Sequence, residues 1–144
     1  FEPEAQEISL EMVRMTISKT AAAGIFDLVD AVGEKKVAKA IDLLREMLVA
    51  GEAPVYIVFM LARQYRLILS VKSLLRERIP ERQMLSQLSL HPYVFRKVLS
   101  QSKNFKEEDL TRGLKHLLEA DVGLKNSYAD PGYLLEMAVM KISS

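Results

Sequence analysis

The stretch LLEADVGLKNSYADPGYLLEM, residues 117–137, marks where one helix ends and the next begins. Apolar residues recur at helical spacing from Leu110 onward, which predicts an amphipathic helix ending near Lys125. Asp130 and Pro131 then suit the N-cap and the first helical position of a second apolar helix. The sequence therefore predicts two consecutive helices joined by a short turn.

One carboxylate lies within the apolar stripe of the first of these helices. Asp121 follows Leu117 by four residues and precedes Leu124 by three, so the three side chains share one helical face. An unpaired buried charge is strongly unfavourable or changes its protonation, so Asp121 is expected to have a cationic partner. Lys125 lies one turn away, but such a helical pair stabilises by only about 0.2–0.5 kcal/mol, which is too little to offset burial.

The motif RQYR at residues 63–66 supplies two other cations on an otherwise apolar helix. The guanidinium group suits buried ion pairs because its planar fork binds both oxygens of a carboxylate. We predict that Arg63 pairs with Asp121 inside the domain and fixes how two helices pack. The alternative is that at least one arginine faces a subunit interface. The candidate interface residues are Arg66, Tyr65 and Lys125.

Periodicity along the rest of the chain predicts helices and no sheet. Helical patterns are expected over residues 10–17, 20–32, 34–50, 54–78, 81–88, 92–102, 106–125 and 131–142. Gly33 and Gly51 are expected to end the helices that precede them. No Asn-Gly or Asp-Gly dipeptide and no sustained alternation of apolar and polar residues is present. The helix at residues 10–17 has few apolar residues and is expected to have packed outside the bundle. The fold class is therefore all-α, a helical bundle of about six to seven helices with residues 54–78 at its centre.

Composition argues against several classes of protein. Lys and Arg number 20 against 19 Asp and Glu, and this net charge of +1 provides no overall field for nucleic acid or an anionic membrane. The absence of cysteine excludes disulfides and thiolate metal sites and favours a cytoplasmic location. No apolar run suggests a membrane span, and the beginning of the chain has no signal-peptide pattern.

No sequence motif indicates catalysis. The chain lacks the patterns G-x-x-x-x-G-K-[ST], G-x-G-x-x-G, G-x-S-x-G and H-E-x-x-H. Its histidines, His91 and His116, have no local spacing with carboxylates that suits a metal. His91 precedes Pro92 and is expected to contact the backbone at a helix start. We therefore predict no catalytic residue, no bound cofactor and no metal site.

Basic and aromatic residues are interspersed between residues 76 and 106. Such a pattern can bind single-stranded nucleic acid through phosphate contacts and base stacking. Glutamates at Glu77, Glu81, Glu107 and Glu108 dilute the positive field, which favours an ordinary solvated face. The candidate weak DNA contacts are Arg96, Lys97 and Lys103.

Four segments carry a resemblance to a known family. They are IFDLVDAVG at residues 25–33, LARQYR at 61–66, LHPYV at 90–94 and LEADVGLKNSYADP at 118–131. Together they resemble the C-terminal region of the delta subunit of the bacterial replicative clamp loader, a component of DNA polymerase III holoenzyme. Each segment is unspecific alone, but their order and spacing are not. The resemblance extends over residues 8–142.

The resemblance implies that residues 20–144 form a helical collar domain and that residues 1–19 end a preceding AAA+ lid domain and its linker. The collar would keep delta docked to the ATP-binding subunits and to delta prime in a pentameric complex that loads the sliding clamp onto primed DNA. An N-terminal domain outside this chain would bind the sliding clamp, and DNA would be contacted indirectly or weakly. The parent protein would be a non-catalytic subunit of a DNA-directed DNA polymerase holoenzyme. The alternative function is a helical nucleic-acid-binding module that uses the basic middle third.

Overall fold

The computed structural model describes residues 24–126 and 129–144, and every regular element within those ranges is a helix. A helical segment over residues 24–33 comes first. It is followed by α2 (Val37–Val49), α3 (Pro54–Arg76), α4 (Glu81–Leu88), α5 (Pro92–Ser102), α6 (Glu107–Asn126) and α7 (Pro131–Ser143). The all-α prediction is confirmed. The helix expected over residues 10–17 and the lid-domain remnant expected over residues 1–19 lie outside the described residues.

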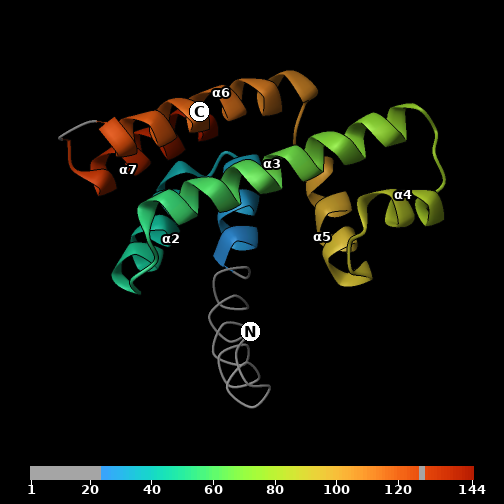
Figure 1. Cartoon of the computed structure of the whole chain (residues 1–144), viewed down its shortest axis with the longest axis horizontal. Helices are drawn as coiled ribbons and strands as arrows, with labels where there is room; N and C mark the ends of the chain where they lie inside the picture. Colours follow the sequence, from blue (N-terminus) through green and yellow to red (C-terminus); the bar gives the residue numbers. More distant parts are fainter. Residues whose placement is uncertain (1–23, 127–128) are drawn as a thin grey trace, which may run out of the picture.

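The long helix α3 crosses the bundle, and the other helices are arranged around it (Figure 1). Helix α6 lies alongside α3 and runs in the opposite direction, while α5 and α7 also contact α3. By length and composition alone α3 could span a membrane, since its most apolar window has a mean hydropathy of 1.2. In the structure 39% of this window is buried inside the domain. The buried side chains of α3 are Ile57, Val58, Leu61, Gln64, Tyr65, Ile68 and Val71.

Three of the helices begin with a proline, and two of these also have a side-chain cap. The prolines at the first helical position are Pro54, Pro92 and Pro131. Asp130 Oδ2 accepts a hydrogen bond from the backbone N–H of Tyr133 at 3.0 Å. His91 Nδ1 accepts one from the backbone N–H of Tyr93 at 3.1 Å. Each cap satisfies a backbone donor that lacks a partner inside the helix, so the predicted roles of Asp130 and His91 are confirmed.

The first helical segment does not end as predicted at Gly33. Gly33 is still helical, and Lys35 takes the left-handed conformation with φ of 59°. The backbone N–H of Lys36 then donates to the carbonyl of Ala31 at 2.8 Å, which closes the helix end. Packing explains the glycine, because a Cβ at residue 33 would lie 2.8 Å from the ring of Phe105. Helix α2 consequently begins later than expected.

A polar network is buried in the core and joins three helices. Gln64 Nε2 on α3 donates to Gln101 Oε1 on α5 at 2.8 Å. Gln101 Nε2 donates in turn to Asp30 Oδ1 at 2.8 Å and to the carbonyl of Phe26 at 3.0 Å. The two glutamines are 3% and 2% exposed, so water does not compete for the bond between them, whereas Asp30 and Phe26 are half-buried. The network therefore ties residues 24–33 to the α3–α5 pair.

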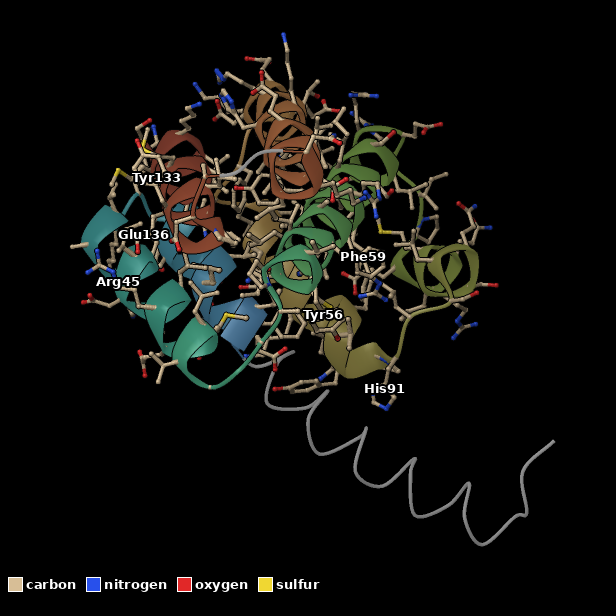
Figure 2. The ribbon with its side chains drawn as sticks, turned by 60° about the vertical axis from the view of Figure 1, so that its left-hand side comes forward. Arg45, Tyr56, Phe59, His91, Tyr133 and Glu136 are labelled. Atoms are coloured by element: carbon tan, nitrogen blue, oxygen red, sulfur yellow. The ribbon has the colours of Figure 1, made fainter. Side chains whose placement is uncertain are left out.

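A surface ion pair joins α2 to α7. Arg45 Nε and Nη2 donate to the two carboxylate oxygens of Glu136 at 3.1 and 3.0 Å, as Figure 2 shows on the side of the bundle formed by these helices. The hydrogen bonds from Arg45 hold the pKa of the Glu136 carboxyl below its usual range. This bidentate ion pair constrains how α2 and α7 lie beside each other. It adds little stability, because both side chains are in contact with solvent.

Candidate protein interface

The predicted ion pair between Arg63 and Asp121 is not formed. The Asp121 side chain is 29% exposed, and it accepts a hydrogen bond from Lys125 Nζ at 2.9 Å. Arg63 is exposed on α3 and makes no ion pair with any residue that the structure describes. Because Asp121 keeps part of its contact with water, its charge does not require a buried cation. The expectation of full burial at Asp121 was wrong.

The rotation of α3 explains this difference. Successive residues of a helix point about 100° apart, so neighbours in the sequence can lie on opposite sides of the buried boundary. Helix α3 turns Gln64 and Tyr65 into the core and leaves Arg63 and Arg66 exposed. The predicted interface role of Tyr65 is therefore wrong, since this side chain is only 1% exposed.

Replacing Asp121 with asparagine is expected to change the free energy of unfolding by less than about 0.5 kcal/mol, as for other helical pairs at solvent-accessible sites. Urea unfolding followed by circular dichroism checks this, with Asp42→Asn on the exposed face of α2 as the matched control. A loss of more than about 2 kcal/mol at Asp121 alone would instead require a buried charge partner.

A groove with a volume of about 420 Å³ runs between α3 and α6. Its α3 wall consists of Val55, Val58, Phe59, Ala62 and Arg66. Its α6 wall consists of Leu114, Leu117, Leu118, Asp121 and Lys125. Two of the three predicted interface residues, Arg66 and Lys125, thus line the same groove, together with Asp121.

Apolar side chains along this groove are exposed. Phe59 is 55% exposed, Val55 41% and Leu118 63%. The ring of Tyr56 stacks on Phe59 with ring centroids 6.5 Å apart, and both side chains project from the same stretch of α3 (Figure 2). A contiguous exposed apolar surface bordered by polar groups is typical of a protein–protein contact site.

The apolar run at residues 55–62 contributes to this groove, although the sequence pattern predicts that it is buried in the core. Residues 55–62 are apolar on all sides of the helix, and this pattern predicts a fully buried central helix. In the structure Ile57, Val58 and Leu61 face the core, whereas Val55 and Phe59 face outward. An apolar helix in this position therefore has two contact faces, one inside the domain and one at its surface.

The candidate DNA contacts lie elsewhere. Arg96 and Lys97 are exposed on α5, and Lys103 is exposed directly after it. Lys97 Nζ lies 5.7 Å from the ring centroid of Tyr93 and 6.0 Å from that of Phe26, which are cation–π distances. Within residues 24–126 and 129–144, no group of three or more His, Asp or Glu side chains is arranged to hold a metal ion.

The fold and the groove define a class of all-α bundle domain in which two antiparallel helices present an exposed apolar channel. Residues 22–142 match the family described as the C-terminal domain of the DNA polymerase III delta subunit, and the chain belongs to this family. The family resemblance predicted from the sequence is therefore confirmed.

A comparison of sequences and a comparison of structures each find a delta protein from Bacillus subtilis that is similar to most of this chain. The chain is 26% identical to the DNA polymerase III subunit delta over 142 residues, which are 99% of this chain and 41% of that protein. Its structure is similar to the DNA clamp loader delta protein with a TM-score of 0.80 and 25% identity, over 93% of this chain and 40% of that one. The chain thus spans about two fifths of the length of these relatives.

Proposed function

We propose that this domain is the collar of a clamp loader delta subunit and that it holds delta in the complex by packing against neighbouring subunits. The observation that supports this role is the exposed apolar groove between α3 and α6 on a chain of the delta C-terminal family. Residues 20–144 would form the collar, and residues 1–19 would end the preceding lid domain. The role is one of positioning and requires no catalytic group.

The energetics of association favour this groove as the contact. Burying exposed apolar surface contributes roughly 25 cal/mol per Å², and a central aromatic side chain commonly dominates such an interface. Phe59 is the exposed aromatic residue of the groove, and Leu118 lies on the opposite wall. An interface centred on them would depend mainly on apolar burial and only weakly on salt.

The partners would be the ATP-binding subunits and delta prime. Contact with the sliding clamp would fall to a domain outside this chain, as would loading of the clamp onto primed DNA. The domain described here would then set the place of delta beside its neighbours while other domains act on DNA. This division of roles is supported by the lining of the groove. Its walls are mainly apolar and carry few groups that could bind phosphate.

Size-exclusion chromatography with light scattering tests the proposal, using the full chain alone and mixed with the purified ATP-binding subunit or delta prime. We expect a defined complex whose affinity falls by less than about tenfold between about 50 mM and about 200 mM salt, since few ionic contacts would form. Failure to form any complex with either subunit would contradict the collar role.

The alternative function, nucleic-acid binding, is carried by one observation. Tyr93 is 61% exposed at the start of α5, with Lys97 beside its ring and Arg96 on the same helix. Single-stranded DNA binding by fluorescence anisotropy over the same salt range separates the two functions. Affinity that falls steeply with salt and is lost in Arg96→Ala/Lys97→Ala, without any subunit complex, would favour this alternative.

A further inference from the structure

The two walls of the α3–α6 groove repeat the same helical spacing. On α3, Val55, Phe59, Ala62 and Arg66 stand at i, i+4, i+7 and i+11. On α6, Leu114, Leu118, Asp121 and Lys125 stand at the same intervals. Each wall is therefore a straight ridge along one side of its helix, about 16 Å long at 1.5 Å per residue. Two such ridges leave between them a channel that matches a third helix.

The antiparallel arrangement of the helices places unlike residues at the two ends of the channel. Tyr65 on α3 lies against Gly113 on α6, so Arg66 lies at the Leu114 end of the channel. The opposite end, near Val55, carries Asp121 and Lys125. The central part between these ends is apolar.

The charges of the channel are not balanced. Lys125 and Asp121 neutralise each other across 2.9 Å. Arg66 makes no ion pair with any residue in the described part of the chain, and it is exposed. The channel therefore presents one uncompensated guanidinium group at one end of an apolar surface. Such a group pairs most favourably with a carboxylate, which it can bind through two parallel hydrogen bonds.

We infer that this channel binds one amphipathic helix of a neighbouring clamp loader subunit, with apolar side chains between Phe59 and Leu118 and a carboxylate paired with Arg66. The inference rests on the proposed collar function and specifies its contact. The bound segment is about three turns long, with apolar residues at i, i+3 or i+4, and i+7. Its acidic residue lies at the end that meets Arg66 and sets the direction of the helix.

A helix is favoured over other occupants by the geometry of the channel. The described residues contain no strand, so no sheet edge is available to bind an extended peptide through its backbone. A second copy of this chain is a poorer match, because two copies placed groove to groove would bring two hollows together, and neither copy would supply a helix to fill the channel of the other.

Site-specific photocrosslinking identifies the occupant directly. The crosslinking amino acid p-benzoylphenylalanine replaces Phe59 in the full chain, which is then mixed with the purified ATP-binding subunit or delta prime. Two exposed tyrosines that do not line the groove serve as control positions: Tyr133 on α7, which is 58% exposed and labelled in Figure 2, and Tyr93 on α5. We expect a crosslink only from residue 59, to a partner segment with an apolar helical stripe and a terminal Asp or Glu. A crosslink between two copies of this chain, or to an extended segment, would overturn the inference.

Matched substitutions then test the two parts of the contact. Phe59→Ala is expected to raise the Kd of the complex by about 30-fold, as at a central aromatic hot spot. Tyr133→Ala is expected to change the Kd by less than about twofold. Arg66→Ala is expected to weaken the complex by about tenfold at low salt and less at high salt. Arg63→Ala is the control, since Arg63 is exposed on the same helix but does not line the groove. Circular dichroism of each variant verifies the fold.

The outcomes distinguish this inference from the proposed function. If the wild-type complex forms but Phe59→Ala and Arg66→Ala bind as tightly as their controls, the collar function stands and the groove is not its contact. Equal effects of Arg66→Ala and Arg63→Ala, with a strong effect of Phe59→Ala, would refute the paired carboxylate. If the wild-type chain binds neither subunit, the proposed function and this inference both fail.

Discussion

Replacing Gln101 with leucine is expected to lower the free energy of unfolding by about 1–3 kcal/mol, because it leaves a buried polar group without its partner. The buried Gln64 amide loses its acceptor. The carbonyl of Phe26 and the carboxylate of Asp30 also lose this donor, but both are only half-buried and the Phe26 carbonyl lies within a helix. Leucine is similar in size to glutamine, so the loss comes mainly from the unsatisfied groups and not from a cavity. Urea unfolding followed by circular dichroism measures it.

Two further variants isolate the network. The double variant Gln64→Leu/Gln101→Leu removes both amides and is expected to recover about half of the loss or more, since one unsatisfied amide disappears. Gln83→Leu, at an exposed glutamine on α4, is expected to change stability by no more than about 0.5 kcal/mol. A Gln101→Leu variant as stable as Gln83→Leu would show that the network does not support the core.

The second large effect is expected at Gly113, where replacement by alanine should destabilise the domain by about 1–3 kcal/mol through overpacking. A Cβ at this position would lie 2.4 Å from Cε2 of Tyr65. The tyrosine ring cannot withdraw easily, because it is 1% exposed and packs edge-on against Phe105 with ring centroids 5.5 Å apart. Thermal and urea unfolding both report the loss.

The same substitution on the same helix provides the control. A Cβ at Gly123 would make an ordinary contact of 3.5 Å with Leu134. Gly123→Ala should therefore stabilise the domain by up to about 1 kcal/mol, since alanine favours a helix over glycine. Tyr65→Leu should relieve much of the penalty of Gly113→Ala in the double variant. Equal effects of alanine at the two glycines would contradict close packing at Gly113.

Local sequence signals predicted the starts of three helices. Pro54, Pro92 and Pro131 begin helices because a proline at the first position loses no hydrogen bond, and Asp130 caps the backbone of the residues that follow it. These effects act within a few residues and do not depend on the rest of the fold. The end of the first helical segment was predicted wrongly, because glycine is required at residue 33 by the close approach of the Phe105 ring and not by a helix end. Phe105 lies far along the chain, so no local signal reveals this contact.

The candidate site was only partly predictable for the same reason. Arg66 and Lys125 were identified as interface candidates, and the structure brings both to one groove. The partner of Asp121 and the burial of Tyr65 were misjudged, because both depend on how far α3 is rotated about its axis. Periodicity defines an apolar stripe but not its edges, and residues 63–66 lie at such an edge.

The amino-acid sequence by itself determined the helical class, the starts of the three helices that begin with proline, and the family, since these follow from periodicity, caps and the order of short motifs. Only the tertiary structure decided which polar side chains enter the core and which apolar ones remain outside. Gln64 is buried because Gln101 comes from another helix to satisfy it, and Phe59 is exposed because no helix of the described chain covers that side of α3. Whether a side chain is buried depends on its neighbours, and the chain brings these neighbours together only when it folds.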